Sequence, residues 1–209
     1  MNILILFAQA WLIGLAIAAP VGPIGLLCIE RTLHRGPWVG FATGLGAATA
    51  DALYAAVGAA GLSVLIAWLT RLSTPLAVGG SLFLLWTGVG IWRRVPAASQ
   101  AAASAPDARR LGEAWLSALG LTLTNPMTIL SFLAVFASLA GNGKPSPLAS
   151  LIMVAGIFAG SASWWCVLAF AGGRLLRRLG AVGRRWVDRL CGALLTVMGV
   201  AMLWRTLMA

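Results

Sequence analysis

The chain has 209 residues, of which 60% are hydrophobic and only 10% are charged, and its mean hydropathy is +0.93. A soluble domain usually carries about a quarter charged residues to cover its core, so a water-soluble globular protein is excluded. The net charge of +10 comes from basic residues that sit in short gaps between long apolar runs. This pattern indicates a multi-spanning membrane protein oriented by its basic loops, and it argues against a nucleic-acid-binding protein.

The apolar runs predict six membrane-spanning helices, because a helix needs roughly 20 mostly apolar residues to cross the hydrocarbon layer. The first run resembles a signal peptide, but no basic residue precedes it and it continues without charge, so we expect it to stay uncleaved. The sixth run spans only if the Arg residues at its two ends extend to opposite interfaces. The predicted spans are residues 1–29, 36–70, 72–92, 114–143, 145–173 and 187–208.

The basic residues predict the orientation of these spans, because Lys and Arg are enriched in cytoplasmic loops. With six spans, all of the 15 basic residues except Arg71, Lys144 and Arg205 fall in or beside the first, third and fifth connections. These connections are therefore expected in the cytoplasm, and both termini are expected outside it.

Matching features in the two halves of the chain predict an inverted repeat. The third and sixth spans each carry Gly-x-Leu and end in Trp-Arg, and the first and fourth each carry Ala-Trp-Leu before a proline. An Ala-, Ser- and Pro-rich stretch separates the halves, and three spans per half give them opposite orientations. The expected organisation is a first three-helix repeat at 1–92, a cytoplasmic linker at 93–113 and a second three-helix repeat at 114–209.

Proline breaks interrupt the first and fourth spans, and irregular backbone survives at membrane depth only where protein or a polar cavity covers it. Two breaks at comparable places in inverted halves point to the central binding site of a transporter. The half-helix ends could hold the carboxylate and ammonium of a zwitterion, whereas a simple packing kink is the alternative. The residues concerned are Pro20, Gly22 and Pro23 in the first span and Thr124, Asn125 and Pro126 in the fourth.

Asp51 is the acidic residue that lies deep inside an apolar run. A charge near the bilayer centre is costly, so an acid there normally faces a cavity and has a partner or a proton. We interpret Asp51 as a proton-coupling group or as the partner of a substrate ammonium. A structural acid that bonds two helices together is the alternative.

Glu30 and Arg31 end the first span on the cytoplasmic side. We interpret them as a solvated interfacial pair, with a gating role as the alternative.

Other classes of site find little support in the sequence. There is no phosphate-binding loop, Ser-His-Asp arrangement or H-E-x-x-H pair, so no enzyme and no cofactor are predicted. His34 has no ligand-type neighbours at suitable spacing, so no metal site is predicted. The cysteines Cys28, Cys166 and Cys191 form no C-x-x-C pair and are interpreted as packing residues.

The chain contains the motif Pro20-Val21-Gly22-Pro23, a series from Gly36 through Asp51 to Gly61, and the pair Asn125-Pro126. Together these features resemble the LysE/RhtB family of bacterial amino-acid exporters. The resemblance implies six helices in two inverted repeats and export across the bacterial inner membrane, driven by the proton gradient. It also implies that the two breaks and Asp51 line the transport pathway. The chain departs from the family pattern at Val21, inserted into Pro-Gly-Pro, and at Met127, where the family commonly has Lys.

The sequence therefore predicts an all-α secondary exporter of an amino acid or similar small polar metabolite, working by proton antiport. The expected partners are the amino acid, protons and the lipid bilayer, and the Gly-rich helix faces are compatible with a homodimer. The alternatives are a related exporter of metal ions and a non-transporting membrane subunit or membrane enzyme.

Overall fold

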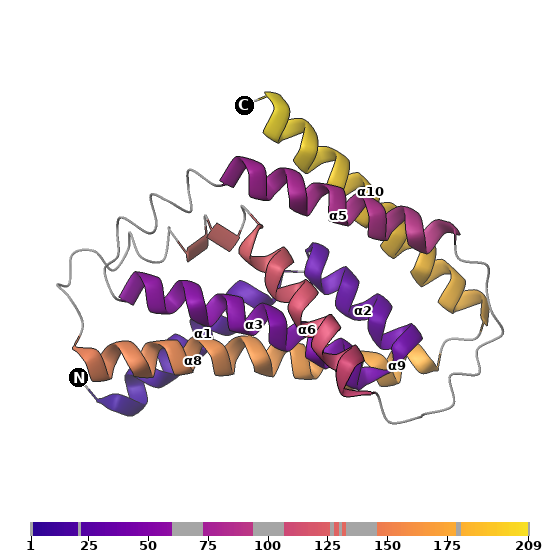
Figure 1. Cartoon of the computed structure of the whole chain (residues 1–209). Coiled ribbons are helices and arrows are strands. Elements are labelled where there is room, and N and C mark those ends of the chain that lie inside the picture. The colour runs from indigo at the N-terminus through magenta and orange to yellow at the C-terminus, as the bar shows by residue number, and fades with distance from the viewer. Residues whose placement is uncertain are drawn as a thin grey trace.

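A computed structural model of the chain describes residues 2–20, 22–59, 73–93, 107–125, 128–129, 131–132, 146–178 and 181–208. These residues are almost entirely helical and contain no strand, which confirms the all-α prediction (Figure 1). The elements are α1 (Ile3–Ala18), α2 (Pro23–Arg35), α3 (Pro37–Ala59), α5 (Ser73–Arg93), α6 (Ala108–Leu123), α8 (Pro147–Cys166), the π-helical turn η1 (Val167–Gly172), α9 (Gly173–Arg177) and α10 (Ala181–Met208).

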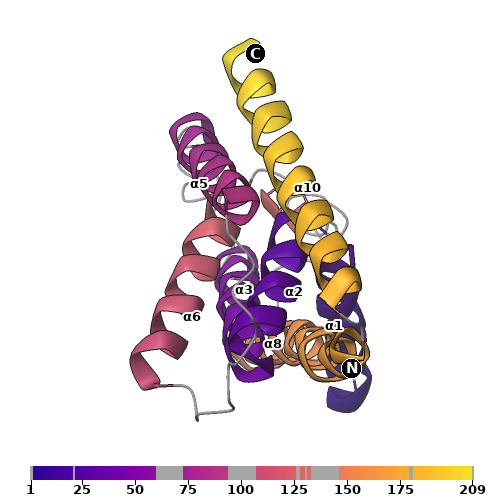
Figure 2. The ribbon, with the colours of Figure 1, turned by 90° about the vertical axis from the view of Figure 1, so that its right-hand side faces the viewer.

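Helix α3 lies at the centre of the packing, with contacts to α2, α6 and α8. Helix α1 packs along α8, whereas α5 and α10 pair with each other and α10 also contacts α2. Figure 2 shows α5 and the C-terminal part of α10 at the top, α1 and α8 at the bottom, α2 and α3 between them, and α6 to the left of α3. The central position of α3 brings Asp51 into the interior of the bundle.

The structure contains both helix interruptions that the prolines predict. Helix α1 ends at Ala18 and α2 begins at Pro23, and the two axes differ by 79°. Gly22 precedes α2 with extended backbone, and Pro23 occupies the first helical position, where its missing N–H breaks no helical hydrogen bond. Helix α6 ends at Leu123, and Thr124 follows in a turn. Pro126 lies outside the described residues.

Two helical stretches among the described residues, Pro147–Leu175 and Arg185–Met208, are long and apolar enough to cross a membrane. The bent α1–α2 pair is a third stretch if it is counted as one span. The last predicted run is therefore long enough to span. The second and fourth predicted runs continue into residues 60–70 and 133–143, outside the described part of the chain, so the count of six spans stays a prediction.

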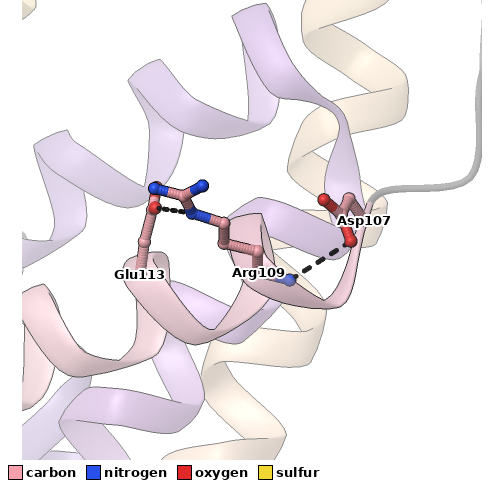
Figure 3. A network of polar contacts seen from close by, with 3 residues as sticks. All are labelled: Asp107, Arg109 and Glu113. Atoms are coloured by element: carbon pink, nitrogen blue, oxygen red, sulfur yellow. Dashed lines mark hydrogen bonds and ion pairs between the residues drawn. The ribbon is translucent and has the colours of Figure 1, made fainter.

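Helix α6 begins at Ala108, six residues before the predicted start of the second repeat at 114. The Asp107 carboxylate caps it by accepting a hydrogen bond from the backbone N–H of Arg109, and Arg109 Nε donates to Glu113 at 3.0 Å (Figure 3). A side-chain acceptor at the N-cap typically stabilises a helix by about 1 kcal/mol, more than an exposed ion pair does. This local capping extends the helix into a segment whose composition suggested a linker.

Helix pairs α3–α6 and α1–α8 are held together by matching contacts. Gly46 on α3 lies against the backbone carbonyl of Trp115, and Gly160 on α8 lies against that of Trp11, so that a Cβ at either glycine would collide with the carbonyl. Trp115 Nε1 donates to Thr49 Oγ1 and Trp11 Nε1 donates to Ser163 Oγ, both at 3.2 Å. Each hydroxyl lies three positions after its glycine. Glycine allows the close helix approach that brings each indole within reach of its hydroxyl.

Candidate functional site

Asp51 is held in the interior by two residues of α8. Its side chain is 3% exposed, and Ser161 Oγ donates to its Oδ2 at 2.7 Å. Ser161 in turn accepts a hydrogen bond from Trp165 Nε1 at 3.1 Å. An indole N–H can only donate, so Trp165 leaves the hydroxyl hydrogen of Ser161 free to point at Asp51. The buried acid therefore sits at the end of a hydrogen-bonded chain that runs from α8 to α3.

Tyr54, three residues after Asp51 on α3, connects this helix to the second break. Its hydroxyl donates to the Leu123 carbonyl at 2.7 Å, and its ring stacks on Phe132 with centroids 5.4 Å apart. Leu123 ends α6, so its carbonyl is among those that lack a partner within the helix. Tyr54 thus satisfies a backbone group that the break releases.

The Thr124 hydroxyl and the Asn125 backbone also satisfy groups that the second break releases. Thr124 Oγ1 donates to the Leu121 carbonyl at 3.1 Å, and the Asn125 N–H donates to the Thr122 carbonyl at 3.1 Å. The Asn125 carbonyl accepts from the Thr128 N–H, which resumes helical bonding after the break. Thr124 and Asn125 are both half-buried.

Apolar residues beside the two breaks belong to one hydrophobic cluster. Ala18 and Ile24, on the two sides of the first break, belong to the same cluster as Leu121, just before the second break. Pro20 is exposed and Pro23 is half-buried. A Cβ placed on Gly22 would meet no atom within 4 Å, so the space beside this residue is open.

The interpretation of Glu30 and Arg31 as a solvated pair is wrong, because their exposed fractions are only 2% and 8%. Gly36, with a φ of 93°, turns the chain so tightly that α3 packs directly back on α2 and covers this end. Arg31 Nη1 donates to Thr43 Oγ1 on α3 and to the Ala114 carbonyl on α6, both at 3.1 Å.

The same end of α2 is also connected to α10. His34 Nε2 lies 2.7 Å from Asp188 Oδ1, and both side chains are partly exposed. The last two turns of α2 therefore make polar contacts with three helices, α3, α6 and α10.

The structure brings some of the predicted site residues together and leaves others apart. Asp51 is linked to the second break through Tyr54, whereas Arg31 contacts α3 at Thr43, eight residues before Asp51, or about 12 Å along a helix. Sequence reasoning missed the contacts of Ser161, Trp165 and Thr43. Ser161 and Trp165 are four residues apart in an apolar run, a spacing that places polar groups on one helix face. Within the described residues, no group of three or more His, Cys, Asp or Glu side chains could hold a metal ion.

If the chain is the exporter that its sequence predicts, removing the Tyr54 hydroxyl is expected to impair transport without unfolding the protein. Tyr54→Phe keeps the ring stacking but leaves the Leu123 carbonyl unsatisfied, a loss of about 1–3 kcal/mol where the group is buried. We expect a severalfold lower initial rate of substrate exchange in proteoliposomes. The matched control is Ser163→Ala, which removes the hydrogen bond from Trp11 away from Asp51 and the second break. An equal loss in both variants would show that Tyr54 has only a packing role.

Interrupted apolar helices together with a buried acid on a neighbouring helix are typical of membrane transporters. The family model of the LysE type translocator matches residues 15–206 of the chain. The protein therefore belongs to the LysE type translocator family and is a membrane transport protein.

Relatives with named activities are similar over most of the chain. The threonine efflux protein of Salmonella typhimurium is 30% identical over 160 residues, which are 75% of this chain and 77% of the relative. The threonine efflux protein of Escherichia coli K12 is 25% identical over 201 residues, 94% of this chain and 97% of the relative. The putative amino acid efflux protein YcgF of Bacillus subtilis is 30% identical over 136 residues, 64% of this chain and 63% of the relative. No solved structure gives a significant match.

Proposed function

We propose that the protein exports an amino acid or a similar small polar metabolite across the bacterial inner membrane by proton antiport. The observation that carries this proposal is the buried acid Asp51, bonded to Ser161 and lying on α3 three residues before Tyr54, which bonds to the second helix break. The family match and the relatives named as threonine and amino acid efflux proteins support an amino acid as the substrate class.

In this proposal Asp51 carries the proton. An acid in a low-dielectric interior holds a proton readily, and the Ser161 hydroxyl can stabilise the ionised form after the proton leaves. The two breaks would supply backbone and amide groups for the substrate. The first break comprises Pro20, Gly22 and Pro23, and the second comprises Thr124, Asn125 and Pro126. The open space beside Gly22 and the half-buried Asn125 support this role.

An inverted repeat accounts for the pairing of the helices. In such a repeat α1, α3 and α5 of the first half correspond to α6, α8 and α10 of the second half. Exchanging the two halves then turns the pair α1–α8 into the pair α6–α3. The same exchange leaves the pair α5–α10 unchanged. The matching glycine and tryptophan contacts of these pairs support the correspondence. We accordingly propose repeats at 1–92 and 114–209, with α6 beginning inside the linker at Ala108. We also keep a cytoplasmic position for the basic connections and both termini outside.

Glu30 and Arg31 would form part of a gate at the cytoplasmic end of this pathway. The contacts of Arg31 with α3 and α6 and of His34 with α10 fasten the end of α2 to three neighbouring helices. Release of these contacts would let α2 move relative to α3 and α10. A homodimer stays a prediction from the sequence.

Counterflow in proteoliposomes tests the proposed function. Vesicles containing the purified protein are loaded with a high concentration of one unlabelled amino acid, and trace labelled amino acid is added outside, with L-threonine first and the other protein amino acids after it. We expect transient, saturable accumulation of label for at least one amino acid, absent from protein-free vesicles. If monodisperse protein gave no counterflow with any of them, an amino-acid carrier would be ruled out.

A further inference from the structure

Arg31 is a buried cation with one anchored nitrogen and an edge that has no partner among the described residues. Its Nη1 donates to Thr43 Oγ1 and to the Ala114 carbonyl, both at 3.1 Å. The Thr43 hydroxyl donates to the Val39 carbonyl at 2.9 Å, so its oxygen is available to accept from Arg31. The guanidinium group is therefore fixed in orientation by α3 and α6 through a single nitrogen.

The rest of the guanidinium group has no hydrogen-bond partner among the described residues. A guanidinium carries five N–H donors on three nitrogens, and only Nη1 is used here. The fully enclosed side-chain nitrogen and oxygen atoms without a partner in the described part of the chain belong to Thr32 and Thr87. Neither Nε nor Nη2 of Arg31 is among these atoms, although the residue as a whole is only 8% exposed.

This arrangement favours a carboxylate ligand. The Nε and Nη2 donors of an arginine point in parallel and match the two oxygens of a carboxylate, and such bidentate hydrogen bonds strengthen where water is largely excluded. An arginine that only fastened helices together would need no free edge. A solvated arginine would not be preorganised, since its flexible side chain would have to be ordered on binding.

The position of Arg31 separates it from Asp51. Thr43 and Asp51 are eight residues apart on α3, about 12 Å at 1.5 Å per residue. An α-amino acid carries its ammonium and carboxylate groups on the same carbon, so it cannot contact Arg31 and Asp51 at once. A ligand at Arg31 would therefore occupy a second position on the pathway, nearer the basic end of α2.

We propose that the Nε–Nη2 edge of Arg31 binds the α-carboxylate of the amino-acid substrate as it enters from the cytoplasm. This inference rests on the proposed function, because it assigns a carboxylate subsite to an amino-acid carrier. Arg31 selects substrates by their carboxylate, and Thr43 and Ala114 position its guanidinium group.

Discrimination between an amino acid and its carboxamide tests this assignment. The amide keeps the ammonium group and side chain but lacks the carboxylate. Counterflow of the labelled amino acid is inhibited with unlabelled L-threonine and with L-threonine amide, or with the corresponding pair if another amino acid is carried. We expect the wild type to bind the acid better than the amide, and Arg31→Gln to reduce that preference about tenfold, as the loss of a charge-assisted hydrogen bond implies.

Two further variants separate a carboxylate subsite from a structural role. Arg31→Lys keeps a positive charge that can still donate to Thr43 and Ala114, but it loses the parallel Nε and Nη2 donors. The acid-to-amide preference should therefore fall while the protein stays folded. Thr43→Val removes one anchor and keeps the charge, so the overall rate should fall more than the preference. An unchanged acid-to-amide preference in both Arg31→Gln and Arg31→Lys, with wild-type counterflow intact, would overturn the subsite and leave the proposed function standing. Absence of wild-type counterflow with every amino acid would overturn both.

Discussion

Asp51→Asn is expected to abolish accumulation driven by a pH gradient while leaving exchange at equal pH within a fewfold of the wild type. Asparagine has nearly the shape of a protonated aspartic acid and can still accept the Ser161 hydrogen bond, but it cannot carry a proton. An exchange cycle that needs only a neutral group at this position should therefore continue. Net transport that needs the group to gain and lose a proton should stop.

The measurement uses vesicles with an acidic interior and with the membrane potential held at zero by valinomycin and equal potassium. One proton exchanged per substrate molecule across one pH unit supports about a tenfold concentration ratio, since one pH unit corresponds to about 1.4 kcal/mol per proton. The wild type should approach that ratio, whereas Asp51→Asn should not exceed the outside concentration. Ser161→Ala, which keeps the acid, should still accumulate substrate at a lower rate.

The variant also separates the two roles that the sequence leaves open for Asp51. If Asp51 paired with the substrate ammonium, its neutralisation would remove a strong attraction and both exchange and accumulation would fail in folded protein. If accumulation in Asp51→Asn equalled that of the wild type, proton coupling through this residue would be wrong.

The parts of the site that sequence reasoning finds are those with local causes. Proline removes an amide donor from its own helix, so the ends of α1 and α6 follow from Pro20, Pro23 and Pro126 wherever the helices pack. An acid within an apolar run is conspicuous by itself, which is why Asp51 could be predicted. The partner of that acid could not be predicted, because Ser161 is 110 residues away and reaches Asp51 only through the packing of α8 on α3.

The errors of sequence reasoning arise from the same separation of local and tertiary effects. Glu30 and Arg31 have the sequence context of an interfacial pair, and only the packing of α3 and α6 over α2 buries them. Helix α6 begins at Ala108 and not at the predicted residue 114, because the Asp107 N-cap starts it within a segment of low hydrophobicity. A polar segment at the end of a span can continue a helix when a capping residue begins it.

The second large effect is expected from two glycines at helix contacts, Gly46 on α3 and Gly160 on α8. Gly46→Leu and Gly160→Leu would each place a side chain against a backbone carbonyl, that of Trp115 or that of Trp11. A backbone atom cannot rotate away, so the helices must separate and the indole hydrogen bonds to Thr49 and Ser163 must break as well. Overpacking of this kind typically destabilises a protein by about 1–3 kcal/mol or more before those losses are added.

Gly120→Leu is the matched control, because Gly120 also lies within a helix but a Cβ there would meet no atom within 4 Å. We expect the control to give a monodisperse gel-filtration peak in detergent with a melting temperature near that of the wild type. Gly46→Leu and Gly160→Leu should both lose that peak or melt many degrees lower than the wild type. The two losses should be similar, since the α3–α6 and α1–α8 pairs use the same contacts. A loss confined to one of them would argue against equivalent pairs and hence against the proposed inverted repeat.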